Sequence, residues 1–155
     1  MDYIIVTIFS YFCGSIPFGL ILTKIFIKKD IRKVGSGNIG ATNVLRTGNK
    51  YLAASTLLLD CSKGYIPVVI TTQLYPELIQ VSALMTFLGH LFPVWLKFNG
   101  GKGVATYLGI LFSLSLTLSF LFIFIWMIVL LIFKYSSVSS MFASFAVLII
   151  SVIKD

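Results

Sequence analysis

Two short segments of this sequence combine glycines with side chains that bind anions. The first, residues 34–46, reads VGSGNIGATNVLR, and the second, residues 98–106, reads FNGGKGVAT. Glycines allow backbone N–H groups to approach an anion closely, and hydroxyl and amide side chains add further hydrogen-bond donors. A guanidinium can grip a phosphate through two parallel hydrogen bonds, whereas an ammonium acts as a point charge. Residue types at this spacing are typical of phosphate binding.

The first segment matches the pattern G-x-G-x-x-G over residues 35–40. The dinucleotide interpretation requires a strand before the glycines. We reject it because an apolar helix and a basic turn precede them. Anion binding remains. It would use the backbone at Gly35 and Gly37, the donors of Ser36, Asn38, Thr42 and Asn43, and the guanidinium of Arg46. The alternative is a flexible glycine turn whose arginine only marks the cytoplasmic side of a membrane, and composition alone does not separate the two.

In the second segment, Lys102 lies between Gly101 and Gly103, just before an expected helix, and Thr106 lies one turn into it. The segment is not a Walker A motif, because glycine and not serine or threonine follows the lysine. A helix N-terminus favours an anion through its exposed N–H groups and its dipole. A single loop lysine would indicate only a cytoplasmic loop. Two such segments on one membrane face favour anion binding.

Three further polar residues fall within apolar stretches. Asp60 and Lys63 share one helix face, and intramembrane charges are usually paired. This pattern favours a structural ion pair or a supporting role for a site. His90 is the only histidine, and we interpret it as a packing residue near the site. Cys13 and Cys61 lack metal-ligand spacing, and neither a metal nor another cofactor is expected.

Composition defines the elements that must position these residues. Of 155 residues, 58% are hydrophobic and 11% charged, and the mean hydropathy is +1.02. A soluble domain is about half apolar and a quarter charged. The net charge of +7 comes from basic residues between apolar runs, which indicates membrane topology and excludes a nucleic-acid module. We therefore predict an all-α polytopic membrane protein with one transmembrane domain over residues 1–155.

Apolar runs predict six spans with the N-terminus outside. They cover residues 3–25, 51–72, 79–97, 104–116, 118–134 and 137–154. We divide 104–134 near the serine-rich stretch 113–119, although a single long helix competes. Two short helices place ten of the twelve basic residues, and both glycine segments, on the cytoplasmic side. Pro17 predicts a kink with close packing at Ser15 and Gly19. Serines from Ser136 on open the last helix.

Four segments, in order, resemble one known family. They are GSIPFG at 14–19, residues 35–46, DCSKG at 60–64, and the stretch from Gly89 to Thr106. They are similar to the bacterial acyl-phosphate:glycerol-3-phosphate acyltransferases, the PlsY family. The resemblance implies a multi-pass protein of the bacterial inner membrane that moves an acyl group from acyl phosphate to the 1-hydroxyl of glycerol 3-phosphate. The products would be lysophosphatidic acid and phosphate, and membrane lipid would be a further partner.

The resemblance also implies residue roles. Catalysis would fall to Ser36, Arg46 and Lys102. Phosphate binding would involve Gly35, Gly37, Asn38, Asn43, Gly101, Gly103, Thr106, Ser137 and Ser140. Asp60, Lys63 and His90 would hold the substrate-binding residues in place without contacting the substrate. No protein base is needed, because the acyl phosphate is already activated and its own oxygens would take the glycerol proton.

Two other functions remain open at this point. A transporter or channel for a phosphorylated anion could use the same basic glycine segments, but its spans should carry more polar residues. Family members usually have a seventh helix followed by a motif of His, Asn, Arg and Glu, and this sequence ends at Asp155 without it. We therefore expect a C-terminally truncated chain, and an inactive truncated homologue is the other alternative.

Overall fold

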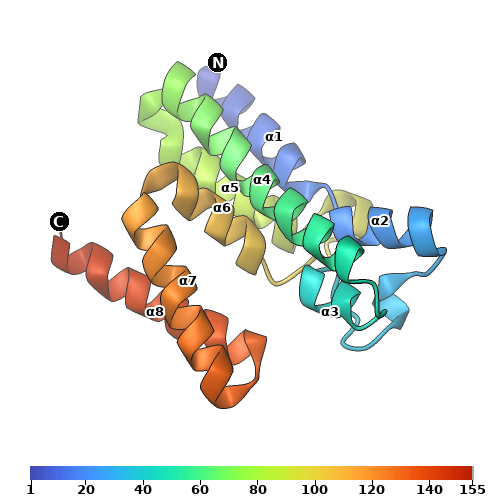
Figure 1. Ribbon diagram of the computed structural model, residues 1–155. Coiled ribbons are helices and arrows are strands. Elements are labelled where there is room, and N and C mark those ends of the chain that lie inside the picture. Colours follow the sequence, from blue (N-terminus) through green and yellow to red (C-terminus); the bar gives the residue numbers. More distant parts are fainter. Residues whose placement is uncertain (155) are drawn as a thin grey trace. The chain divides into compact units, whose positions relative to one another are not determined.

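The computed structural model describes residues 1–154 and places only helices and loops there (Figure 1). Eight α-helices and three single turns of 3-10 helix follow one another among those residues. The elements are α1 (Asp2–Ser15), α2 (Phe18–Ile27), η1 (Ile31–Lys33), α3 (Ala41–Leu45), α4 (Lys50–Leu74), η2 (Pro76–Leu78), α5 (Ile79–Leu91), η3 (Val94–Leu96), α6 (Val104–Leu114), α7 (Leu116–Phe133) and α8 (Ser136–Lys154).

The chain divides into two compact units. The first covers residues 1–113 and holds both glycine segments, and the second begins at Leu114. In the second unit α7 packs along α8, where the rings of Phe133 and Phe142 stack with centroids 6.2 Å apart. That one domain covers residues 1–155 stays a prediction.

The predicted kink at Pro17 is confirmed as a break between two helices. Helix α1 ends at Ser15 and α2 begins at Phe18, because proline has no N–H to continue the helical ladder. The predicted close packing at Gly19 is also observed. A Cβ on Gly19 would overlap the carbonyl oxygen of Ile39, so a segment 20 residues further along the chain lies directly against α2.

The predicted division of the stretch 104–134 is confirmed. Helix α6 ends at Leu114 and α7 begins at Leu116. Between them Ser115 is extended, and its hydroxyl accepts a hydrogen bond from the Leu118 N–H at 3.4 Å. A serine competes with the helical ladder in this way and caps the next helix. At the other end of α7, Lys134 adopts a left-handed conformation, and α8 begins at Ser136 as expected.

Glycines bring the helices of the first unit into close contact. A Cβ on Gly14 of α1 would overlap the Thr86 carbonyl of α5, and one on Gly89 of α5 would overlap the Tyr11 carbonyl of α1. Gly64 faces α6 in the same manner. Small residues let backbones approach where lipid removes the hydrophobic drive between helices. The helices are therefore held by close backbone packing.

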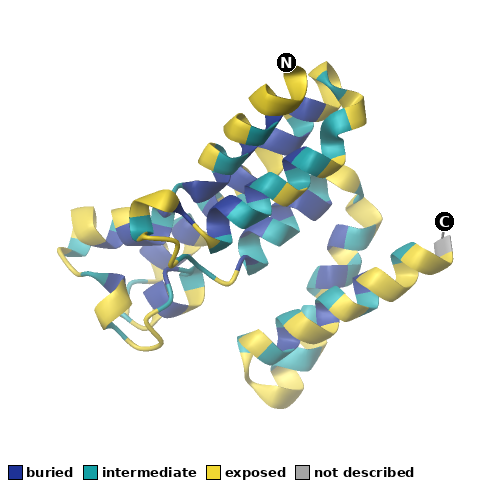
Figure 2. Cartoon of the chain, turned by 180° about the vertical axis from the view of Figure 1, so that it is seen from behind, coloured by how far each residue is buried: buried dark blue, intermediate teal, exposed yellow. Residues whose placement is uncertain are grey.

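Burial in the helices is the reverse of a soluble protein. Many large apolar residues are exposed, while many serine and threonine residues are buried. Figure 2 shows how buried and exposed positions alternate along the helices. The fully buried hydroxyls include those of Ser10, Thr23, Thr56, Ser82, Thr86 and Thr106. Within residues 1–154, five helices are long and apolar enough to cross a membrane, and α6 is a shorter apolar helix. The count of six spans and the external N-terminus stay predictions.

The connector between α2 and α4 is folded, which the sequence did not predict. Its residues Ile31, Ile39 and Val44 are almost fully buried and pack with Leu20 of α2. Leu96, which precedes the second glycine segment, packs against the same cluster. This small apolar core holds both segments at one end of the first unit.

Candidate active site

The first glycine segment, which we call the first loop (residues 34–46), begins after a charged turn. Asp30 caps η1 by accepting a hydrogen bond from the Arg32 N–H at 3.0 Å. The Arg32 guanidinium also meets the Asp30 carboxylate in a fork, with distances of 2.9 Å from Nε and 2.6 Å from Nη2. This contact holds the pKa of the Asp30 carboxyl below its usual range and raises the pKa of Arg32. The charge of Arg32 is thus already paired.

Asn43 holds the first loop together from inside. Its Nδ2 donates to the carbonyls of Ile31, Val34 and Asn38 at 2.8–3.0 Å. Its Oδ1 accepts from the Ser36 N–H at 3.0 Å, and the residue is 2% exposed. One buried amide therefore fixes four points of the loop. Both ends of the amide are hydrogen-bonded to the backbone. Its contact with phosphate stays a prediction.

The first loop brings Ser36 and Arg46 together. Gly35 has a φ of 54°, and a Cβ there would lie 2.7 Å from Arg46 Cδ and 3.0 Å from Nη1. The arginine side chain thus lies against Gly35, the residue that precedes Ser36. Both Ser36 and Arg46 are exposed. Because Asn43 fixes the Ser36 amide, a hydroxyl and a guanidinium are held near one another and open to an anion.

The second glycine segment, or second loop (residues 98–106), lies against the end of α5. The N–H groups of Gly100 and Gly101 donate to the carbonyls of Leu91 and His90 at 3.0 and 3.1 Å. A Cβ on Gly101 would overlap His90 Nε2, and one on Gly103 would overlap the Phe87 ring. Glycine is therefore required on both sides of Lys102, the one exposed residue from Gly100 to Gly103.

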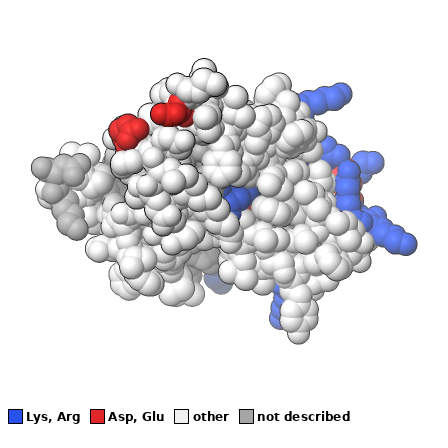
Figure 3. Space-filling view, turned by 90° about the horizontal axis from the view of Figure 1, so that it is seen from above, with Lys and Arg blue, Asp and Glu red and all other residues white. Residues whose placement is uncertain are grey.

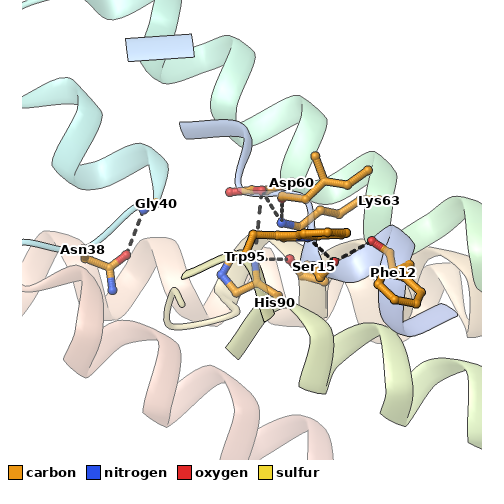
Figure 4. A network of polar contacts seen from close by, with 10 residues as sticks. Phe12, Ser15, Asn38, Gly40, Asp60, Lys63, His90 and Trp95 are labelled. Carbon is orange, nitrogen blue, oxygen red and sulfur yellow. Dashed lines mark hydrogen bonds and ion pairs between the residues drawn. The ribbon is translucent and has the colours of Figure 1, made fainter. Parts of the chain in front are cut away.

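Behind the second loop lies a buried polar cluster made of Asp60, Lys63, His90 and Thr106. Figure 4 labels the first three of these residues. Lys63 Nζ is 2.9 Å from Asp60 Oδ1, which in turn is 4.0 Å from His90 Nδ1. His90 Nδ1 is also 3.0 Å from the Thr106 hydroxyl. All four residues are 5% exposed or less. The three residues expected to support the site are thus brought together, and Thr106, expected at a phosphate, joins them.

Charge is distributed unevenly over the first unit. Lys and Arg side chains gather at one end of the view in Figure 3, and acidic side chains are visible toward the opposite end. Asp30 is an exception, because it is paired with Arg32 in the basic region. The basic residues of this region are Lys24, Lys28, Lys29, Arg32, Lys33, Arg46 and Lys50. Such a cluster attracts anionic substrates before they reach the loops.

Ser137 and Ser140, the remaining predicted phosphate ligands, lie on α8 in the second unit. Ser137 is exposed, and the Ser140 hydroxyl donates to the Ser137 carbonyl at 2.9 Å. Their role at a phosphate stays a prediction. No group of three or more potential metal ligands occurs within residues 1–154.

Sequence reasoning missed the backbone partner of Lys63. Its Nζ donates to the carbonyl of Ile16, which lies at the break between α1 and α2. Pro17 marks that break, and a helix break leaves carbonyl groups in need of a donor. Trp95 was missed as well. Its indole N–H donates to the Ser15 hydroxyl at 2.8 Å, which ties η3 to the same break.

Comparison with protein families agrees with this arrangement. The model of the family described as glycerol-3-phosphate acyltransferase matches residues 4–154, nearly the whole chain. The chain belongs to the glycerol-3-phosphate acyltransferase family. The resemblance seen in the sequence motifs is therefore confirmed, as is the all-α membrane fold.

Several members of this family are more than 50% identical to this chain. The glycerol-3-phosphate acyltransferase of Pelagibacter ubique (strain HTCC1062) is 58% identical over 147 residues, which are 95% of this chain and 77% of the relative. That of Mesorhizobium japonicum is 54% identical over 141 residues, covering 91% of this chain and 72% of the relative. The chain thus spans about three quarters of the length of these family members.

Two crystal structures of family members share the fold. Both are of PlsY, an integral membrane glycerol 3-phosphate acyltransferase. The glycerol 3-phosphate form has a TM-score of 0.94 at 34% identity and covers 99% of this chain and 78% of that one. The lysophosphatidic acid form has a TM-score of 0.90 at 33% identity, with the same coverage.

Proposed function

We propose that this chain transfers a fatty acyl group from acyl phosphate to the 1-hydroxyl of glycerol 3-phosphate. The products are lysophosphatidic acid and inorganic phosphate. The observation that supports this proposal most is a pair of exposed cations, Arg46 and Lys102, each held by a rigid glycine loop at one end of the first unit. Two loops suit a reaction with two anionic substrates. The related PlsY structures in glycerol 3-phosphate and lysophosphatidic acid forms support the same substrate and product.

Each loop has a separate role in this proposal. Ser36 and Arg46 bind one phosphate by a hydroxyl and a forked guanidinium, while Gly35, Gly37 and Asn38 keep the backbone close to it. Lys102 binds the other phosphate as a point charge, with Gly101 and Gly103 beside it. Asn43 keeps Ser36 in place. Thr106, Ser137 and Ser140 would add donors.

The reaction balances without a protein nucleophile. The glycerol hydroxyl oxygen attacks the acyl carbonyl carbon, and the bond from that carbon to the phosphate oxygen breaks. Phosphate leaves with the bonding electrons and takes the hydroxyl proton on one of its oxygens. Arg46 and Lys102 stabilise the charge on the phosphates and hold the reactants in line. His90, the single histidine, is 3% exposed and faces Thr106, so it is poorly placed to act as a base.

We further propose that the protein resides in the bacterial inner membrane with both loops in the cytoplasm. The basic end of the first unit supports this orientation, because cytoplasmic loops carry an excess of Lys and Arg. Apolar side chains on the outer faces of the helices fit contact with membrane lipid. An acyl chain could then lie along a helix surface while its phosphate meets the loops.

Donor discrimination tests the function directly. The purified chain in lipid nanodiscs is incubated with radiolabelled glycerol 3-phosphate and either acyl phosphate, acyl-CoA or acylated carrier protein. We expect labelled lysophosphatidic acid and one equivalent of phosphate with acyl phosphate alone. Product formed only from a thioester donor would contradict the assigned donor. Uptake of label into sealed vesicles without any product would favour transport of a phosphorylated anion instead.

A further inference from the structure

The Asp60–Lys63 pair of the buried polar cluster has no role in the reaction just proposed, although both side chains are charged and buried inside the first unit. Asp60 and Lys63 are 2% and 5% exposed and lie in the middle of α4. Charges in apolar surroundings are costly even when they are paired, and hydrophobic residues of similar size often replace them without loss of stability. The pair lies between the supports of the first loop and those of the second loop, and this position indicates its role.

One side of the cluster reaches the first loop. Lys63 Nζ donates to the Ile16 carbonyl, at the break that sets the direction of α2. Gly19, one turn further on, lies against the carbonyl of Ile39 within the first loop. A displacement of Ile16 would therefore move α2 and the loop resting on it.

The other side of the cluster reaches the second loop. Asp60 Oδ1 lies 4.0 Å from His90 Nδ1, which is a contact and not a hydrogen bond, and the same ring nitrogen is hydrogen-bonded to the Thr106 hydroxyl at 3.0 Å. The opposite ring nitrogen, Nε2, lies against Gly101, which also donates its N–H to the His90 carbonyl at 3.1 Å. Any rotation of the His90 ring would displace Gly101 and the adjacent Lys102.

We propose that the Asp60–Lys63 ion pair is a positioning device that sets where the first loop lies relative to the second. The proposal rests on the function proposed above. Neither residue touches a substrate; Lys63 acts through Ile16, and Asp60 acts through His90. The Lys63 ammonium joins the Ile16 carbonyl to the Asp60 carboxylate, which lies against His90, so one ion pair contacts the supports of both loops. An apolar pair of equal size would make neither polar contact. A misplacement of about 1 Å lowers an enzymatic rate by about 10²-fold.

The test removes both charges at once. A single substitution leaves its partner charged and buried, which destabilises the chain for reasons unrelated to the loops. The double variant Asp60→Asn/Lys63→Met avoids that problem. We expect it to fold, with kcat lowered about 30- to 100-fold and KM for each substrate changed less than about threefold, because each loop keeps its own ligands.

The chain offers a matched control. Ser10 and Ser82 are fully buried and joined by a hydrogen bond of 2.8 Å between α1 and α5. The double variant Ser10→Ala/Ser82→Ala removes a polar contact between helices without touching Ile16 or His90. Its kcat should stay within about twofold of the original chain, since it does not move either loop.

A distance measurement makes the test independent of activity. Spin labels are attached at Thr42→Cys and Asn99→Cys, both exposed positions outside the proposed ligand set, in a Cys13→Ser/Cys61→Ala background. We expect one narrow distance in the labelled chain and a broadened or shifted distribution in the Asp60→Asn/Lys63→Met variant. An unchanged distribution in the folded variant would overturn the proposal, whatever the kcat. If the original chain forms no product, the proposed function fails while the label distances still decide the positioning role.

Discussion

The two loops present a cation in the same way but are built differently. The first loop is held by its own hydrogen bonds, with the Asn43 side chain joined to four backbone groups within 12 residues of it. The second loop is held from outside, since Gly101 and Gly103 are pressed against His90 and Phe87 of α5. Local bonds therefore shape one loop and tertiary packing shapes the other. Loss of the hydrogen bonds within the first loop should stay local, whereas a change in α5 should reach the second loop.

The largest effect is expected at the cation of the second loop. Lys102→Ala should lower kcat/KM by about 10²- to 10³-fold, because a charge that stabilises the leaving phosphate is lost. The melting temperature should hardly change, since Lys102 is exposed. Initial rates of lysophosphatidic acid formation measure this. The matched control is Lys97→Asn, an exposed lysine with φ of 52°, which asparagine tolerates. Full activity of the Lys102 variant would remove that residue from the site.

The next effect tests the packed support of the second loop. Gly101→Ala places a methyl group against His90 Nε2. The His90 ring is buried and the Gly101 N–H is bonded to the His90 carbonyl, so neither residue can move away freely. We expect a loss of about 1–3 kcal/mol in unfolding free energy and a fall in kcat of about tenfold or more. Gly40→Ala in the first loop is the comparison, because its Cβ would meet only Asn38 Oδ1 at 3.1 Å. Equal losses in both variants would contradict the contrast between the loops.

A smaller and more local effect is expected from Asn43→Asp. The carboxylate keeps the shape of the amide but loses both N–H donors, so three carbonyls of the first loop lose their partner. The local opening free energy should fall by about 1–3 kcal/mol. Amide hydrogen exchange should accelerate in residues 31–46 and stay unchanged in residues 98–106. Faster exchange in both stretches would show that the first loop is not an independent unit.

The smallest effect is expected at Asp30. Its folded-state pKa lies below the ordinary value of about 4, so its ion pair with Arg32 is present above that pH and is lost as the pH falls through the folded value. Asp30→Asn should cost under about 1 kcal/mol, because the pair is exposed. Thermal unfolding of the original chain should show no contribution from Asp30 to a change between pH 5 and 8. A larger loss in the variant within that range would assign Asp30 a further partner.

The sequence predicted the helices better than the loops between them. Pro17 acts through its missing N–H and Ser115 through its capping hydroxyl, both within their own segment, so both helix breaks could be recognised from residue type. The short helix α3 and the apolar core under the first loop could not, because Ile31 and Val44 are buried only by residues of other elements. The five candidate membrane spans coincide with apolar runs that are visible in the sequence.

The residues of the candidate site likewise fall into those that the sequence predicted and those that it did not. Glycines beside Ser36, Arg46 and Lys102 indicated anion binding, since the chemistry lies in the residues themselves. The engagement of Asn43 with the backbone, and of Thr106 with His90, depends on distances that the sequence does not contain. Asp60 and Lys63 were correctly paired from their spacing on α4, but the Ile16 carbonyl became visible as a partner only in three dimensions.

The central claim is that each loop binds one of two anionic substrates. It is tested most directly by amide hydrogen exchange of the unaltered chain in nanodiscs, with glycerol 3-phosphate, with a non-transferable acyl phosphonate, and with both. The account predicts that each ligand slows exchange in one loop, within residues 34–46 or 98–106, and that the two together protect both. Protection confined to other segments, while lysophosphatidic acid is still formed, would contradict the account.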